Sequence, residues 1–269
     1  MPKELDGLNT PAMKQFQEIK SRFPEGILFF RMGDFYEMFL DDAIIASSIL
    51  DIALTKRQNQ IPMCGIPYHA AENYISRLIS AGKTVVICEQ IKLEGAKLMP
   101  REVVRVITPG TVVEENLIKG YENNFLCFIY FYHHKLFLTF VDITTSELYF
   151  FEVDRPEKTH VSTLFEKFPP AEILVFKEQI LTWENLEVPS DAVCTLLDSN
   201  MISLPGEGNF ANIKEVIDSF LKRNFKENTF HFNSPNIIKE NDYMELDFNT
   251  IKNLDLIENQ NPNEKEHSL

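Results

Sequence analysis

Residues 31–39, RMGDFYEMF, bring an aromatic ring and several charges together within one short stretch. FYEMF has the alternation of a β-strand, which places Phe35, Glu37 and Phe39 on one face and Tyr36 and Met38 on the other. A large ring therefore lies beside a carboxylate on the same face. Two interpretations follow for Phe35, a core aromatic or a ring presented for binding, and Glu37 is correspondingly either a solvated charge or a ligand contact.

Four carboxylates, those of Asp34, Glu37, Asp41 and Asp42, fall within nine residues, a pattern that a metal-dependent nuclease could use. Asp41 and Asp42 are explained equally well as charges in the first turn of a helix. Asp142, in TFVDITTSEL, occupies the place of a first metal-binding aspartate in a ribonuclease H-like nuclease, but no second or third carboxylate follows at a comparable strand end. We therefore expect no enzyme activity. Plasmid cleavage with Mg²⁺ or Mn²⁺ that Asp142→Asn abolishes would contradict this.

Helical and strand patterns interleave over the first 115 residues, which is typical of an α/β domain. Thr10 followed by Pro11 predicts a helix start, and Pro24 predicts its end. Gly33-Asp34 predicts the turn of a hairpin, and the prolines and glycine of residues 61–67, IPMCGIP, predict a loop. The remaining predictions are strands at 27–30, 35–39, 84–90 and 103–110, and helices from Asp41 to about Leu50 and over 70–82.

A different pattern follows the polar segment 112–124, which is predicted to be a linker. NFLCFIYFY, KLFLTFVDI and ELYFFEV predict three strands in an antiparallel meander, with turns at His133-His134 and at Thr144–Ser146. A helix at about 157–167, a strand at 172–176 and a helix at about 211–223 are predicted next. Meander strands followed by alternating helices and strands favour a ribonuclease H-like arrangement.

The net charge of −14 argues against nucleic acid when taken as an average. The charge is uneven, however, because residues 1–120 carry a net −1 and the remainder carries −13. Residues 55–105 contain eight basic and four acidic side chains. Surface scatter explains this excess as well as phosphate contact does, but any phosphate contact is expected within this segment.

The four cysteines, Cys64, Cys88, Cys127 and Cys194, are far apart and none belongs to a C-x-x-C pair. They predict buried free thiols rather than a zinc site. The sequence contains no P-loop motif, so ATP binding is not expected. No apolar run is long enough to span a membrane, and the N-terminus is polar, so a cytoplasmic location is expected.

Five motifs resemble, in order, the N-terminal domain of the MutS family of DNA mismatch repair proteins: TPAMKQF, FFRMGDFYEMF, SSILDIALTKR, IPMCGIPYHAAENYISRLISAGKTVVICEQ and REVVRVITPGT. NNFLCFIYF, FVDITTSEL and PAEILV resemble the connector domain of the family. MELDFNTIKNLDLIEN resembles the start of its core and lever region, with Asp255 where the family usually has glutamate. The resemblance implies a mixed-sheet α/β mismatch-recognition domain at 1–115, a ribonuclease H-like connector at 116–240 and a truncated core segment at 241–269.

The resemblance also implies roles for particular residues. Phe35 would insert as a wedge at a mispaired or unpaired base from the minor groove, and Glu37 would hydrogen-bond that base. Lys56, Arg57 and Arg105 could hold phosphates. Met63 could pack against a sugar or pack within its own loop.

Mismatched double-stranded DNA and a MutL-type repair protein are the partners implied. ATP, Mg²⁺ and the dimer belong to the full-length family, because the clamp and ATPase regions are absent from this sequence. We therefore expect a monomeric, nucleoid-associated fragment without a cofactor. The alternative is a connector fragment that docks a MutL-type partner without binding DNA by itself.

Overall fold

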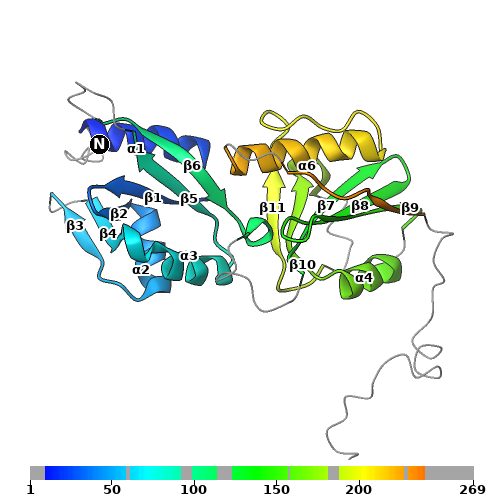
Figure 1. Cartoon of the computed structure of the whole chain (residues 1–269), viewed down its shortest axis with the longest axis horizontal. Coiled ribbons are helices and arrows are strands. Elements are labelled where there is room, and N and C mark those ends of the chain that lie inside the picture. Colours follow the sequence, from blue (N-terminus) through cyan, green and yellow to red (C-terminus); the bar gives the residue numbers. More distant parts are fainter. Residues whose placement is uncertain are drawn as a thin grey trace, which may run out of the picture.

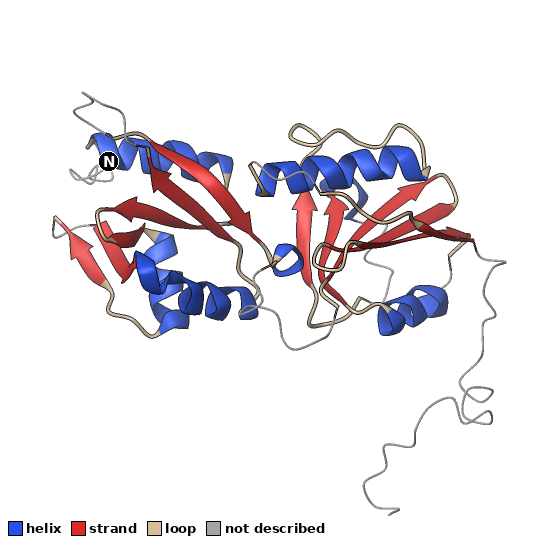
Figure 2. Ribbon diagram, viewed as in Figure 1, coloured by secondary structure: helices blue, strands red, loops and turns tan. Residues whose placement is uncertain are grey.

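The computed structural model of the chain describes residues 10–58, 61–91, 99–113, 123–156, 158–180, 188–226 and 230–239. Two sheets lie side by side, and each has helices on both faces (Figure 1; Figure 2). The predicted core segment at 241–269 and most of the predicted linker lie outside the described residues.

Among the described residues, the first sheet has six strands in the order β3-β4-β2-β1-β5-β6. β1 pairs in parallel with β5, and the other neighbours are antiparallel. The predicted hairpin is confirmed: β1 and β2 are joined at Gly33, whose φ of 61° suits a residue without a side chain. The strands are β1 (Ile27–Met32), β2 (Phe35–Phe39), β3 (Thr55–Arg57), β4 (Ile61–Pro67), β5 (Val85–Gln90) and β6 (Arg101–Ile107).

Helix α1 (Pro11–Arg22) begins where predicted, because the Thr10 hydroxyl accepts a hydrogen bond from the Met13 N–H. Its apolar side packs on one face of the sheet, where Phe16 meets Phe30 and Phe39 edge-on. Helices α2 (Asp41–Leu50) and α3 (Ala71–Ser80) cover the other face. Two hydrophobic layers therefore fix which face each β2 side chain takes.

The predicted loop at 61–67 is wrong, because these residues form strand β4. β4 pairs with β2 along its length and with the short strand β3 at its beginning. Proline is tolerated where a strand begins or ends, and here Pro62 is the second residue and Pro67 the last. Gly65 lies between them, opposite Glu37.

The described part of the second half also forms a six-stranded sheet, in the order β11-β10-β7-β8-β9-β12. The predicted meander is confirmed, since β7 (Phe125–Tyr132), β8 (Lys135–Asp142) and β9 (Glu147–Asp154) are antiparallel neighbours. β10 (Pro170–Phe176), β11 (Val193–Leu197) and β12 (Asn236–Lys239) extend the sheet by parallel pairing. This strand order is compatible with the predicted ribonuclease H-like fold, which stays a prediction.

Helix α6 (Phe210–Asn224) packs on one face of the second sheet, and helix α4 (Lys158–Lys167) packs on the other. The predicted helices at 211–223 and 157–167 are therefore confirmed. The turn at His133-His134 is also confirmed, and His133 adopts a positive φ of 56°. Strands β3, β11 and β12 were not predicted from the sequence.

Candidate functional site

Phe35 is an exposed aromatic at the beginning of β2. Its side chain is 48% exposed, whereas Phe39, on the same face of the same strand, is 1% exposed. Phe39 lies under α1 in contact with Phe16, so the helix completes the hydrophobic layer only at that end of the strand. Phe35 is therefore not part of the hydrophobic core, and the interpretation of its ring as a core aromatic is wrong.

Glu37 lies between the buried Phe39 and the exposed Phe35 on this face. Its carboxylate is 3.3 Å from the Arg57 Nη1 and its side chain is partly buried. Burial raises the pKa of Glu37, while the charges of Arg57 and Arg101 act in the opposite direction. The carboxylate is therefore partly buried and ion-paired rather than freely solvated, which contradicts the interpretation as a solvated strand charge.

Two arginines flank Glu37 from different strands. Arg57, at the end of β3, places its guanidinium 5.6 Å from the Phe39 ring centroid. Arg101, at the start of β6, lies 4.6 Å from the Phe30 ring centroid and donates to the Arg31 carbonyl oxygen at 2.8 Å. Sequence reasoning counted Arg101 among the basic residues but gave it no role. The predicted strand that contains REVV was the available signal for Arg101. This strand, β6, pairs with β5, and β5 pairs with β1.

The other predicted contacts are not all brought together. Met63, opposite Phe39 in β4, packs at the border of the α1 layer, so it lies close to the site. Lys56 is exposed, and alternation along β3 directs it to the face opposite Arg57. Arg105 lies elsewhere, at the junction with the second half, where its guanidinium stacks on the Phe225 ring at 3.4 Å and donates to the carbonyls of Val106 and Thr111.

A second polar cluster lies at the same end of the sheet, on the opposite face. Tyr36 donates a hydrogen bond to Glu89, and burial together with this partner raises the pKa of Tyr36. Arg31 lies 3.8 Å from the Glu89 carboxylate and stacks on the Tyr68 ring at 3.4 Å. These contacts link residues on both sides of the turn at Gly33-Asp34, next to Phe35.

Two of the carboxylates considered for a nuclease, Asp42 and Asp142, have structural partners. Asp42 lies in the first turn of α2 as predicted, but it is buried, ion-paired with Lys20 at 2.6 Å, and accepts a hydrogen bond from the Leu28 N–H at 3.0 Å. Asp142 is buried and accepts the N–H groups of Asn124 and Thr144. Within the described ranges, no cluster of three His, Cys, Asp or Glu side chains could hold a metal ion.

The described thiols form no disulfide, and Cys64, Cys88 and Cys127 are buried as predicted, whereas Cys194 is exposed. In the part of the chain that the structure covers, no helix is long and apolar enough to cross a membrane.

Comparison with known proteins places this site within a family. The family model for MutS domain I matches residues 10–116. The DNA mismatch repair protein MutS of Leptospira interrogans is 46% identical over 98% of the chain, and those of Borrelia garinii and Halothermothrix orenii are 38% and 37% identical over 97%. The chain spans about a third of the length of these curated relatives, 31% to 33%. With a MutS domain I at residues 10–116 and similarity that continues through the second sheet, the chain belongs to the MutS family.

Proposed function

We propose that this chain is a DNA mismatch recognition module in which Phe35 is an aromatic wedge and Glu37 contacts the base beside it. The observation that carries the proposal is the 48% exposure of Phe35 on a sheet face whose next aromatic, Phe39, is fully covered. A ring that the fold holds but does not bury is available to stack on a base. No catalytic step is proposed.

The energetics of a wedge favour a defective base pair. Insertion of an apolar side chain into the minor groove unstacks a base step and kinks the duplex at a cost of a few kcal/mol. The cost is lowest where pairing is already lost. Stacking on an aromatic ring returns roughly 1–3 kcal/mol per base. Phe35 would therefore discriminate by how easily a step deforms, which suits recognition of many different mispairs.

Glu37 would add a hydrogen bond to the displaced base. The carboxylate accepts from a base N–H when charged, and donates to a purine ring nitrogen only when protonated. Its pKa is already raised by burial in the free chain, and nearby phosphates would raise it further. Arg57 and Arg101 would then balance the phosphate charge beside it.

The test is fluorescence anisotropy at low salt, with a homoduplex and with a duplex that carries one unpaired thymine. We expect the native chain to prefer the unpaired base and Phe35→Ala to lose that preference, by about fivefold to a hundredfold if stacking provides it. Ile237→Ala is the matched control, because Ile237 is 50% exposed and lies on β12 in the other half.

Equal preference in native chain and Phe35→Ala would refute the wedge. Glu37→Gln should change the pH dependence of binding to a mispaired purine, and identical binding at every pH would exclude the proton-sharing form of the contact. We propose a monomer that binds DNA weakly and with strong salt dependence, in a cytoplasmic, nucleoid-associated setting. A tight, salt-insensitive complex would contradict that part.

A second candidate function is docking of a MutL-type partner through the connector. Residues 116–240 carry a net charge of −7, and Leu196 and Ile237 are exposed on the two outer strands of the second sheet, β11 and β12. Outer strands present backbone groups that another protein can pair with. Binding of a MutL-type protein that persists in Phe35→Ala, with no DNA preference in the native chain, would favour this function.

A further inference from the structure

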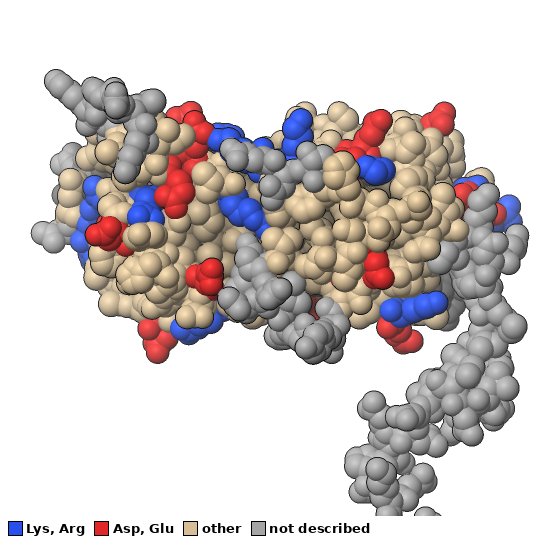
Figure 3. Space-filling model, viewed as in Figure 1, with Lys and Arg blue, Asp and Glu red and all other residues tan. Residues whose placement is uncertain are grey.

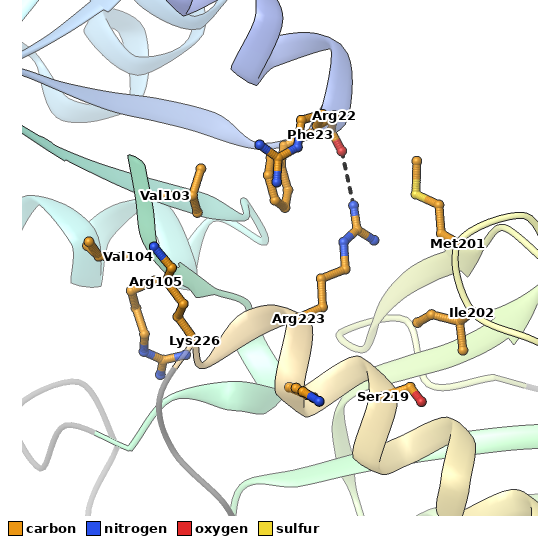
Figure 4. Close-up of a pocket in the computed structure, with 11 residues that line it drawn as sticks. Arg22, Phe23, Val103, Val104, Arg105, Met201, Ile202, Ser219, Arg223 and Lys226 are labelled. Atoms are coloured by element: carbon orange, nitrogen blue, oxygen red, sulfur yellow. Dashed lines mark hydrogen bonds between the residues drawn. The ribbon is translucent and has the colours of Figure 1, made fainter. Parts of the chain in front are cut away.

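A cavity of about 510 Å³ opens between the two halves of the molecule. The end of α1 and strand β6 form one wall, and α6 with the segment after β11 forms the other (Figure 4). It does not include the Phe35–Glu37 face. Its lining residues are Arg22, Phe23, Val103, Val104, Arg105, Met201, Ile202, Ser219, Lys222, Arg223 and Lys226.

The charged residues of this lining are all cationic. Lys226 is ion-paired with Glu102, and Arg105 donates to backbone carbonyls. Arg22, Lys222 and Arg223, in contrast, form no ion pair with any carboxylate among the described residues. Within the described part of the chain, three of the five cations at the cavity therefore have no carboxylate partner, although the chain as a whole carries −14. Lys and Arg side chains also lie along the boundary between the two halves in the space-filling view (Figure 3).

Two of these cations are held together by the fold. Arg223 extends from α6 toward the end of α1 and donates to the Arg22 carbonyl oxygen at 3.0 Å (Figure 4). The guanidinium carbons of Arg22 and Arg223 lie 5.7 and 4.9 Å from the Phe23 ring centroid. Partial burial of the Arg223 guanidinium, followed by the charge of Arg22, lowers its pKa. Like charges are brought close here with no carboxylate of the described residues paired to them, which is unfavourable unless an external anion completes the arrangement.

We propose that this cavity binds the phosphate groups of a nucleotide-sized ligand, held by Arg22, Lys222 and Arg223. Guanidinium groups match phosphate oxygens with two parallel hydrogen bonds, and lysine adds a point charge. The cavity volume falls within the usual range for small-molecule sites, about 300–1,000 Å³. Phe23, Val103 and Ile202 provide an apolar wall for the uncharged part of such a ligand.

Phosphate could reach the cavity from a small polyphosphate or from the backbone of single-stranded DNA. Either source would contact both halves at once, because Arg22 belongs to α1 and Lys222 and Arg223 belong to α6. Binding would therefore restrain the two halves relative to each other. This site is independent of the wedge proposed for Phe35.

The test is isothermal titration of the full chain with inorganic triphosphate and, separately, with a short oligothymidylate at low salt. Arg22→Gln/Lys222→Gln is the main variant, because both side chains are exposed and neither forms a hydrogen bond or ion pair with another described residue. Arg223→Gln is tested separately. Lys14→Gln/Lys83→Gln is the control, with the same loss of charge outside the cavity. Circular dichroism verifies that every variant is folded.

We expect one ligand per chain and a loss of affinity of about tenfold or more in Arg22→Gln/Lys222→Gln, since a charge-assisted hydrogen bond contributes roughly that factor. The control should bind as the native chain does. The titrant whose binding is lost identifies the source of phosphate. The proposal would be overturned if the native chain bound neither titrant. It would also be overturned if the cavity variants bound as tightly as the native chain.

Discussion

Replacement of Glu172 would test how the two halves are joined. Glu172 lies in β10, is fully buried, and accepts hydrogen bonds from the Thr108 hydroxyl, the Gly110 N–H at 3.0 Å and the Thr195 hydroxyl at 2.6 Å. Thr108 and Gly110 belong to the end of the MutS domain I match, whereas Glu172 and Thr195 belong to the second sheet. One carboxyl group therefore connects the two halves.

The magnitude for Glu172→Ala follows from these partners. The Thr108 hydroxyl keeps a second partner in Thr111 at 2.8 Å, but the Gly110 N–H loses its acceptor inside the protein. An unsatisfied buried donor costs about 1–3 kcal/mol, and the space left by the side chain adds to that. We expect a loss of about 2–4 kcal/mol in the free energy of unfolding.

Glu172→Gln should behave differently. The amide oxygen keeps the acceptor for Thr108 and Gly110, and the amide NH₂ donates to the Thr195 hydroxyl, which is able to accept. Because the Thr108 hydroxyl and the Gly110 N–H keep their acceptor and the glutamine fills the same space, we expect a smaller change than for alanine, about 1 kcal/mol at neutral pH.

Burial raises the pKa of Glu172, so folding favours its neutral form. The stabilisation from this shift is complete below the pKa of the unfolded chain and is lost as pH rises through the folded pKa. The native chain should therefore lose stability relative to Glu172→Gln as pH increases. Urea unfolding followed by circular dichroism over a pH series measures this difference. A glutamine variant as unstable as the alanine variant, or a difference that does not change with pH, would refute the reasoning.

Three further predictions concern other parts of the molecule. A Cβ on Gly208 would lie 2.2 Å from the Phe137 ring, so Gly208→Ala should lower the free energy of unfolding by about 1–3 kcal/mol in urea titrations, and an unchanged midpoint would contradict this. Thr10→Ala should cost about 1 kcal/mol by removing the cap of α1, while Thr10→Ser should retain most of the stability. Because burial raises the pKa of Glu37, Glu37→Gln should gain thermal stability relative to the native chain as pH rises through that pKa, and a gain toward acid pH would show the opposite sign.

Local signals in the sequence were sufficient for most elements. Thr10-Pro11, Gly33-Asp34 and the uninterrupted apolar runs of the meander each depend on neighbours within a few residues, and each prediction is confirmed. The residues 61–67 show where local signals fail. Proline and glycine predict a loop when taken alone, but pairing with β2 and β3, which lie elsewhere in the chain, makes the segment a strand.

The site was predictable in part for the same reason. Alternation along β2 placed Phe35 and Glu37 on one face, and the structure confirms that placement. Arg57 was among the predicted contacts, but the sequence favoured Arg105 over Arg101, because the two lie only four residues apart on the same strand, roughly 13 Å along it. Arg101 pairs with Gln90 at the start of β6, donates to the Arg31 carbonyl oxygen, and acts on Glu37 through its charge, whereas Arg105 contacts Phe225 at the junction.

The exposure of Phe35 follows from the limited reach of one helix. Alternation in FYEMF assigns Phe35 and Phe39 to the same face, but it does not say how far along that face a helix will extend. Phe16 of α1 covers Phe30 and Phe39, and no described apolar side chain continues the layer over Phe35. Extending the layer would bury the ring and add stability, since a buried Phe is worth about 1.5–3 kcal/mol relative to an exposed one. The fold forgoes that stability at the position where the proposed function needs a ring that is free to stack.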